Sequence, residues 1–258
     1  MKDLTIYIPS RSRPNVRTMQ IIPRELLKRT RIVVRPDEEA LYAAAGYRNL
    51  IALPKKIEGL SPTRQWILDN SETRYQIQLD DDFSSLAYKP NLKVFGGLRK
   101  ASEKELLECF LLMREWLSAY AHCGISDRVG SARSQEEFKE NTLLMQFLCY
   151  DTKVVLKSKS RFDRFTLAQD KDMTLQLLTK GWKNIVSRRF SYNCAATGAK
   201  GGCDLYRTEK MRTEQMNLFA KEYPGIVKVV QKPVKVNGEV IMRTKKIVYW
   251  NKAYRSAK

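Results

Sequence analysis

Short apolar segments alternate with helical segments over the first eighty residues, and this alternation constrains the fold more than any other feature. Four segments read as strands: 4–8, 31–34, 50–53 and 75–79. Helices are expected between them over 37–45, with Asp37 as the N-cap, and over 61–69, with Pro62 at the first helical position. Strands that alternate with helices usually pair in parallel. The sequence therefore predicts an α/β fold with a Rossmann-like, mixed, mostly parallel sheet flanked by helices.

The second part of the chain predicts further elements around a long helix. Residues 102–121 form one periodic helix that opens with the capping-box pattern from Ser102 to Glu105. The other expected elements are a loop over 124–141, a strand over 143–150, a loop and helix over 165–181, a short strand over 185–186, and a terminal helix followed by a β-hairpin with its turn at 236–239. The 258 residues suffice for one domain with a large core.

The composition excludes several classes of protein. No stretch approaches the ~20 consecutive apolar residues of a membrane-spanning helix, so we expect no membrane partner. The segment Met1–Pro9 reads as a strand and lacks the apolar core of a signal peptide. Five cysteines without a Cys-x-x-Cys pair fit neither a disulfide framework nor a structural zinc site. We expect reduced thiols and a cytoplasmic protein, located in the host cytoplasm if a bacteriophage encodes it.

The chain is strongly basic. Its 47 Lys and Arg against 28 Asp and Glu give a net charge of +19. Such a charge is typical of proteins that bind nucleic acid, although a solvated basic surface without a partner is the alternative. Basic residues gather near the C-terminus, among apolar and aromatic ones: Lys228, Lys232, Lys235, Arg243, Lys245 and Lys246. These could neutralise phosphates while the aromatics stack on bases, or the aromatics could form the core of a hairpin with a solvated basic face.

Three consecutive carboxylates, Asp80, Asp81 and Asp82, follow the strand over 75–79. If the strand continues, Asp80 and Asp82 point to one side and Asp81 to the other. The carboxyl ends of parallel strands border the crevice where such sheets bind ligands. Carboxylates together with substrate phosphates are the usual ligands of Mg²⁺ or Mn²⁺, so Asp80 and Asp82 are candidate metal ligands. The alternative is an acidic turn that water solvates.

A second acidic motif opens the helix expected near residue 170. Asp170 and Asp172 begin that helix, and Thr166 and Gln169 have the spacing of a capping box that would fix its start. A carboxylate at a helix N-terminus is stabilised as an anion and could serve as a general base. Alternatively, both acids only cap the helix.

The two acidic motifs together resemble the GT-A glycosyltransferases, in which an Asp-x-Asp motif after a strand is paired with a later acidic helix start. More narrowly, the chain is similar to the phage and TET-associated DNA glycosyltransferases, which modify pyrimidines such as 5-hydroxymethylcytosine. Three segments carry this similarity: 8–14 (IPSRSRP), 79–83 (LDDDF) and 201–208 (GGCDLYRT). The resemblance spans residues 4–208 and implies a GT-A fold with a C-terminal extension on the acceptor side.

The resemblance also implies roles for individual residues. Residues 1–100 would bind a nucleotide-sugar such as a UDP-sugar, and 101–258 would shape the acceptor site. Asp170 would be the catalytic base of an inverting transfer, and Mn²⁺ or Mg²⁺ would lie at Asp80 and Asp82. Arg11, Arg13 and Arg64 could offset the charge of the diphosphate. The full set expected at the donor is Pro9, Ser10, Arg11, Arg13, Asp37, Arg64, Asp80 and Asp81.

The acceptor would be a modified base in DNA, flipped out of the helix. The glycine-rich segment 198–203 could let backbone amides approach a phosphate. The residues expected to bind nucleic acid are Arg128, Arg133, Lys200, Arg243, Lys245 and Lys246. One departure from the GT-A pattern is that the only histidine, His122, precedes the second acidic motif and does not fit the late metal ligand of many such enzymes. We do not expect it to be catalytic.

Three other functions compete with this hypothesis. A GT-A enzyme could act on a lipid, saccharide or protein, with its basic charge incidental. A metal-dependent nuclease also uses clustered carboxylates and a basic surface, although no Glu-x-Lys companion lies near Asp80. A non-catalytic DNA-binding module would need none of the acidic residues. The sequence leaves the sugar, the acceptor base, the stereochemistry and the oligomeric state open.

Overall fold

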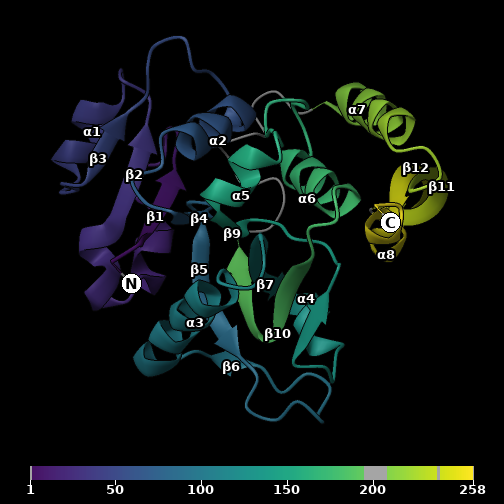
Figure 1. The fold of residues 1–258 in the computed structure, drawn as a ribbon, viewed down its shortest axis with the longest axis horizontal. Helices are drawn as coiled ribbons and strands as arrows, with labels where there is room; N and C mark the ends of the chain where they lie inside the picture. The colour runs from purple at the N-terminus through teal and green to yellow at the C-terminus, as the bar shows by residue number, and fades with distance from the viewer. Residues whose placement is uncertain (1, 195–207, 237–238, 258) are drawn as a thin grey trace.

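A computed structural model describes residues 2–194, 208–236 and 239–257 (Figure 1). In this part of the chain, ten strands form one mixed sheet in the order β3-β2-β1-β4-β9-β7-β10-β5-β6, with β8 paired to β10. Helices cover both faces of the sheet. The prediction of an α/β fold built on a mixed sheet is confirmed.

The first four strands of the chain form the parallel end of the sheet. They are β1 (Leu4–Pro9), β2 (Thr30–Val34), β3 (Leu50–Ala52) and β4 (Tyr75–Leu79). All three pairings among them are parallel. β1 and β4 are buried on both faces, as parallel strands covered by helices require. The strands predicted over the first eighty residues are therefore confirmed.

The other half of the sheet changes direction. β9 runs antiparallel between β4 and β7, whereas β10 runs parallel to β7 and antiparallel to β5. The bounds of these strands are Phe83–Tyr88 for β5, Arg99–Lys100 for β6, His122–Asp127 for β7, Phe138–Glu140 for β8, Phe147–Asp151 for β9 and Asn184–Cys194 for β10. The ends of β4, β7 and β10 therefore lie along the same edge of the sheet.

Two apolar cores lie on opposite faces of the sheet. Ile77 and Cys149 belong to the core that includes Phe110 of α3 (Glu103–Trp116), whereas Leu148 and Tyr150 belong to the core that includes Met173 of α6 (Gln169–Thr179). This follows from strand geometry, because successive side chains point to opposite faces.

The helices and 3₁₀ turns are η1 (Arg17–Ile21), η2 (Arg24–Arg29), α1 (Glu39–Ala44), α2 (Leu60–Asp69), α3 (Glu103–Trp116), α4 (Arg128–Ala132), α5 (Thr152–Lys157) and α6 (Gln169–Thr179).

Several predicted elements are corrected by the structure. The segment 124–141, predicted as a loop, contains most of β7 with α4 and β8. The strand expected over 185–186 is part of an eleven-residue strand, β10. The capping box of α3 is confirmed, but the helix ends at Trp116 because the chain turns there into β7. Asp37 is not the N-cap of α1, whose cap residue is Glu38 without a side-chain hydrogen bond.

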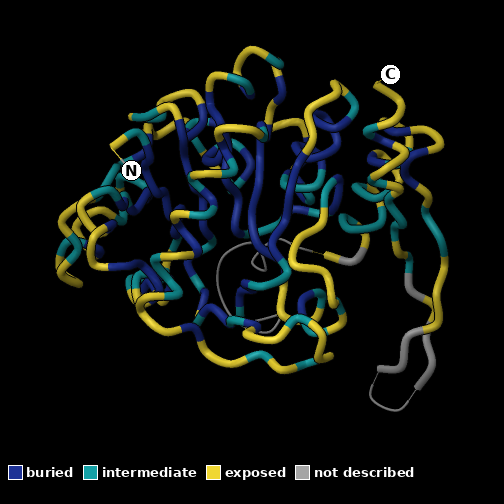
Figure 2. Tube along the Cα trace, turned by 60° about the horizontal axis from the view of Figure 1, so that its bottom comes forward, coloured by how far each residue is buried: buried dark blue, intermediate teal, exposed yellow. Residues whose placement is uncertain are grey.

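A C-terminal unit follows the sheet. It consists of α7 (Glu209–Glu222), the hairpin strands β11 (Val227–Val236) and β12 (Glu239–Val248), and α8 (Trp250–Arg255), which the sequence did not predict. Phe219 and Tyr223 of α7 pack against Leu175 and Leu178 of α6, which attaches the unit to the body. Figure 2 shows the hairpin projecting away from the body of the molecule.

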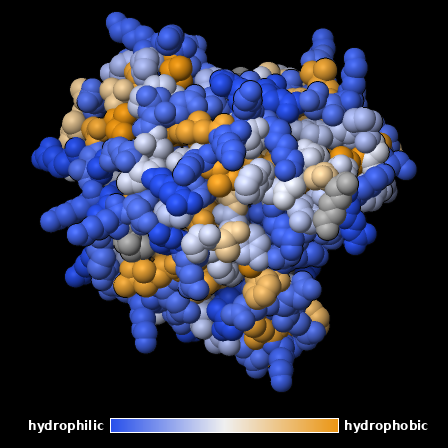
Figure 3. Space-filling model, viewed as in Figure 1, coloured by the Kyte–Doolittle hydropathy of each residue, from blue (hydrophilic) through white to orange (hydrophobic). Residues whose placement is uncertain are grey.

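The surface is mainly polar. The face shown in Figure 3 is largely hydrophilic, with apolar residues in small separate patches. Among the helices of the described ranges, none has the length and apolar character needed to cross a membrane.

We predict that Gly124→Ala destabilises the protein. Gly124 lies in β7 opposite Leu148 of β9, and an added Cβ would overlap Leu144 Cδ1 and the carbonyl oxygen of Phe147. Because the carbonyl belongs to the backbone, the overlap cannot be relieved by a rotamer change. We expect a loss of about 1–3 kcal/mol or more in the free energy of unfolding, measured from the urea midpoint at unchanged slope. Ile125→Val, in the same strand, is the control and should cost about 0.5–1.5 kcal/mol; equal losses would contradict the prediction.

Candidate active site

The three acidic residues form the turn between β4 and β5. Asp81 is the most buried of them, and its carboxylate is held by two donors from the loop after β1. Ser10 Oγ donates to Asp81 Oδ2 at 2.6 Å, and Arg13 Nη1 donates to Oδ1 at 3.0 Å. The loop that was predicted to contact the donor is thus fixed to the acidic turn.

Arg64 supports the turn from behind. This α2 residue is 1% exposed, and its Nη2 donates to Asp80 Oδ1. Burial raises the pKa of Asp80 to about 6, because the loss of hydration, together with the nearby Asp82, Asp170 and Asp81, outweighs the attraction of Arg64. Nε and Nη1 of Arg64 are buried without a hydrogen-bond partner in the described structure. The guanidinium of Arg64 contacts Asp80 in this structure. Its contact with a diphosphate therefore remains a prediction.

Asp82 differs from its two neighbours because one of its oxygens is buried without any hydrogen-bond partner. Its Oδ2 lies 3.5 Å from Arg13 Nη1, whereas Oδ1 has no partner in the described structure. Burial, and then the charge of Asp81, raises the pKa of Asp82. Arg13 contacts both Asp81 and Asp82, so the alternation expected from a continuing strand does not apply: the residues lie in a turn.

This donor set fits a divalent cation that substrate phosphates help to hold. Within the described ranges, no cluster of three or more His, Cys, Asp or Glu side chains forms a metal site. Mg²⁺, however, is typically held by one or two carboxylates together with substrate phosphates. The unpartnered Asp82 Oδ1, with Asp80 beside it, matches that arrangement.

Thr18 is a supporting residue that the sequence analysis missed. Its Oγ1 donates to the carbonyl of Asp80 at 2.5 Å and accepts the amide of Phe83 at 3.0 Å. Its amide donates to the carbonyl of Asp81 at 3.3 Å. The hydroxyl therefore fixes the backbone on both sides of the acidic turn. Nothing in the sequence around Thr18 indicates this long-range contact.

Asp170 lies at the start of α6 and close to the acidic turn. The helix begins at Gln169 after Ala168, whose φ of 67° is left-handed, and no side chain caps it. The capping box predicted from Thr166 and Gln169 is therefore wrong. Asp170 lies near enough to contribute to the raised pKa of Asp80 and of Tyr192, after the larger effect of burial in both cases. The structure thus brings together the two acidic motifs.

Asp172 has a different environment. It is fully buried, and its carboxylate accepts Tyr223 Oη at 2.6 Å and Gln176 Nε2 at 2.7 Å. Burial raises its pKa to about 6, against the hydrogen bond from Tyr223 and the charge of Arg164. Both oxygens are engaged, so Asp172 joins α6 to α7 and cannot reach an acceptor.

The remaining residues predicted to bind the donor are Pro9, Arg11 and Asp37. Pro9 is the last residue of β1, and Arg11 follows in the loop. Asp37 is exposed and accepts Arg35 Nε at 3.0 Å, which lowers its pKa; Arg11 contributes a smaller part of the same shift. Arg11 and Asp37 are therefore neighbours, as a shared donor site requires. Their contact with a nucleotide remains a prediction.

The residues predicted to bind nucleic acid are separated in the structure. Arg128 and Arg133 are exposed on and just after α4, and Lys245 is exposed on β12. Lys246 instead points inward, with Nζ 4.3 Å from the centre of the Phe219 ring. Burial, and then the charge of Lys171, lowers its pKa to about 7. Lys200, the segment 198–203 and the side chain of Arg243 lie outside the described residues.

His122 lies at the opposite end of β7 from this edge. It is fully buried, stacks on Tyr150 with 6.2 Å between ring centres, and has its pKa lowered to about 3 by burial. It therefore belongs to the core. The four described cysteines, Cys109, Cys123, Cys149 and Cys194, are free.

Comparison with known proteins places the chain in a family. The family model described as TET-Associated Glycosyltransferase matches residues 4–202. The Beta-glucosyl-HMC-alpha-glucosyl-transferase of Enterobacteria phage T2 is 22% identical over 207 residues, which cover 75% of this chain and 72% of the relative. Its counterpart from phage T6 is 21% identical with the same coverage.

A solved structure shows the same fold. S. aureus TarS 1-349, in complex with UDP-GlcNAc, matches with a TM-score of 0.55 at 15% identity, over 85% of this chain and 66% of that chain. The match confirms the predicted GT-A fold. Because the family model covers well over half of the residues, this protein belongs to the TET-associated glycosyltransferase family and is a GT-A glycosyltransferase.

Proposed function

We propose that this glycosyltransferase moves a sugar from a UDP-sugar to the hydroxyl of a modified pyrimidine in DNA, such as 5-hydroxymethylcytosine, with inversion and with Mn²⁺ or Mg²⁺. The observation that carries the proposal is the proximity of Asp170 to the acidic turn, where Asp82 Oδ1 has no hydrogen-bond partner among the described residues. Residues 1–100 would bind the donor and 101–258 the acceptor. The names of the phage relatives support a hydroxymethylcytosine acceptor, carried there as its β-glucosyl form.

The chemistry divides between the two acidic motifs. Asp170 would accept the proton of the acceptor hydroxyl while that oxygen bonds to the anomeric carbon and the bond to the diphosphate breaks. Asp82 and Asp80 would hold the cation, which when bound neutralises charge on the leaving diphosphate. Arg13, which already contacts Asp81 and Asp82, would help to compensate the diphosphate charge.

One assay tests the function as a whole. The protein is incubated with UDP-sugars and with DNA containing 5-hydroxymethylcytosine or its β-glucosyl derivative. The DNA is then digested, and the masses of the nucleosides are measured by mass spectrometry. Transfer to either base supports the proposal, whereas donor turnover that requires a saccharide or protein acceptor overturns it. The anomeric configuration of the product decides the stereochemistry: an α-linked product from an α-linked donor means retention and removes the general-base role of Asp170.

The metal assignment predicts a loss of activity without unfolding. Asp82→Asn should lower transfer by orders of magnitude, because it removes the charge of the carboxylate with the free oxygen. Excess chelator should abolish transfer by the native protein, and Mn²⁺ or Mg²⁺ should restore it. Asp69→Asn, at an exposed carboxylate on α2, is the control for the change in charge. Undiminished turnover in excess chelator would contradict the assignment of a metal site to Asp80 and Asp82.

The base assignment predicts that two neighbouring acids behave differently. Asp170→Asn should lower kcat by about 10²–10⁴-fold with donor affinity intact, because an amide cannot take the proton. Asp172→Asn should instead lower the melting temperature with kcat largely retained, since Asp172 is bound to Tyr223 and Gln176. Near-native turnover of the Asp170 variant would place the base elsewhere.

The DNA assignment predicts a salt-dependent interaction at the hairpin. DNA affinity should fall by about 0.9 log units per log unit of salt for each phosphate contacted. Replacing the exposed Lys228, Lys232 and Lys245 by Gln should flatten this slope and raise KM for DNA without changing KM for the donor. The matched control replaces three exposed lysines outside the hairpin: Lys2, Lys28 and Lys104. Equal effects of the two triple variants would mean that only net charge matters.

A further inference from the structure

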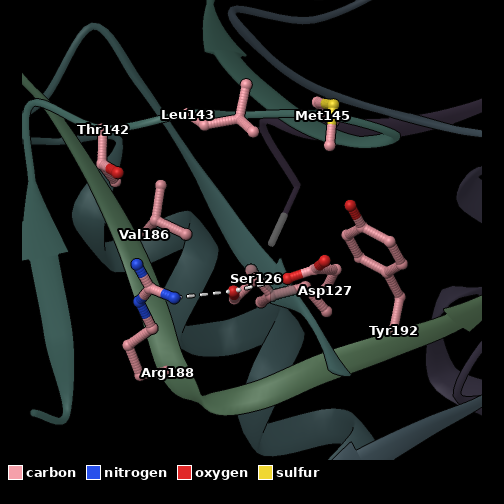
Figure 4. Close-up of a pocket in the computed structure, with 9 residues that line it drawn as sticks. Ser126, Asp127, Thr142, Leu143, Met145, Val186, Arg188 and Tyr192 are labelled. Carbon is pink, nitrogen blue, oxygen red and sulfur yellow. Dashed lines mark hydrogen bonds between the residues drawn. The ribbon is translucent and has the colours of Figure 1, made fainter. Parts of the chain in front are cut away.

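A small hollow lies beside the acidic turn, at the end of β7. Ser126 and Asp127 form its floor, Arg188 and Tyr192 of β10 flank them, and Val186 and Met145 supply apolar walls (Figure 4). Its space is about 350 Å³ when the open mouth is counted. Tyr192 stacks on Phe83, which directly follows Asp82, with 5.2 Å between ring centres. The hollow and the acidic turn are therefore adjacent.

A break in the pairing of β10 with β7 brings Arg188 to the hollow. Ser187 pairs with Ile125 and Ser191 pairs with Ser126, so three residues of β10 bulge out between consecutive positions of β7. Bulges of this kind re-aim side chains and are common next to active sites. Arg188 Nη1 donates to Ser126 Oγ at 3.1 Å, and its Nε is buried without a partner in the described structure.

Asp127 presents a carboxylate on the other side of the same hydroxyl. Its Oδ1 accepts hydrogen bonds from the amide of Gly130 at 2.8 Å and from Ser126 Oγ at 3.4 Å, and Oδ2 has no partner among the described residues. Among the described residues, Arg188 Nη1 bonds to the Ser126 hydroxyl and not to the Asp127 carboxylate. A Cβ on Gly130 would collide with Ser126 Oγ, Arg188 Nη1 and Asp127 Oδ1. The close approach of α4 to these groups thus depends on glycine at position 130.

The Asp127 carboxylate accepts hydrogen bonds and the Arg188 guanidinium donates them, on either side of the Ser126 hydroxyl. This pair matches a ligand with a hydrogen-bond donor next to an acceptor along one edge. Cytosine has this pattern, with the N4 amino group beside N3 and O2. Carboxylates accept from cytosine N4, and enzymes read flipped bases along this edge between apolar or aromatic walls. Uracil has a carbonyl where cytosine has the amino group. The Asp127 carboxylate would then face another hydrogen-bond acceptor, and no hydrogen bond could form. Sugar hydroxyls both donate and accept, and do not need a fixed pattern.

We propose that Asp127 and Arg188 form the pocket that reads the edge of the flipped acceptor base and selects cytosine-type over uracil-type bases. The proposal rests on the proposed function and names the residues that determine its acceptor specificity. Asp127 accepts from N4, and Arg188 donates to the ring acceptors beside it. The exposed Arg128, next to Asp127 in the chain, would bind a flanking phosphate.

The test compares two acceptors that differ only in the base. Matched DNA duplexes carry 5-hydroxymethylcytosine or 5-hydroxymethyluracil, and kcat/KM is measured for each with saturating donor. The native protein should prefer the cytosine form by roughly 5-fold to 150-fold, the range of one good base contact. Asp127→Asn, which keeps the N-cap of α4 and can donate to a carbonyl, should bring the two values close to parity.

Arg188→Met should lower kcat/KM for hydroxymethylcytosine DNA by at least 10-fold. The matched control is Arg189→Met, the next residue of β10, whose guanidinium pairs instead with Glu137 at 2.7 Å. Release of UDP from the donor without DNA is the second readout, and it should not change in the Asp127 and Arg188 variants. A fall in this release would mean that the hollow binds the sugar of the donor, which overturns the proposal.

The outcomes separate the pocket from the function. Transfer to both bases at a ratio that neither substitution alters overturns the pocket and leaves the proposed function in place. Transfer to neither base, and none to the β-glucosyl form of 5-hydroxymethylcytosine, overturns the proposed acceptor, and the pocket with it. A preference for cytosine that Asp127→Asn removes, with Arg189→Met and UDP release unchanged, supports both.

Discussion

The structure around the site depends on compensating three adjacent carboxylates. Two like charges about 4 Å apart repel by roughly 4 kcal/mol near a protein surface, so the turn from Asp80 to Asp82 requires positive partners. Arg13 comes from the loop after β1, and Arg64 comes from the interior of α2. These contacts fix the loop, the helix and the end of β4 relative to one another. Within the part of the chain that the structure describes, they leave Asp82 Oδ1 without a hydrogen-bond partner, and a substrate-bound cation there would complete the compensation.

The change of strand direction at β9 brings the second half of the chain to this turn. An all-parallel sheet would need a crossover between neighbouring strands, whereas β9 lies antiparallel between β4 and β7. The ends of β7 and β10 then lie beside the end of β4, and α6 presents Asp170 over the same edge. Groups from β1, β4 and α2, which we propose bind the donor, thus meet groups from β7, β10 and α6, which we propose bind the acceptor.

Local patterns in the sequence predicted the elements whose signals are local. The strands before Asp80 and the capping box at Ser102 depend on neighbouring residues, and the structure has them. The αL residue Ala168 and the bulge that carries Arg188 depend on tertiary packing, and no local pattern indicates them. The segment that contains Asp127 is polar and therefore predicts a loop, whereas the structure has the end of β7 there, with Gly124 where the fold needs a residue without Cβ.

Net charge alone did not predict how the basic residues would be divided between the two sides of the hairpin. Lys245 and Lys246 are adjacent in β12, so strand alternation must place them on opposite faces. Lys245 faces solvent, whereas Lys246 lies over Phe219 of α7. Burial, and then the charge of Lys171, lowers the pKa of Lys246, and the charges of Asp170 and Asp172 oppose this shift. Lys246 packs against Phe219 of α7, and its pKa is influenced by Asp170. The inner face of the hairpin therefore lies near the start of α6. If the outer lysines hold DNA as proposed, the strand would pass the side of the molecule that carries α6, at whose start Asp170 lies.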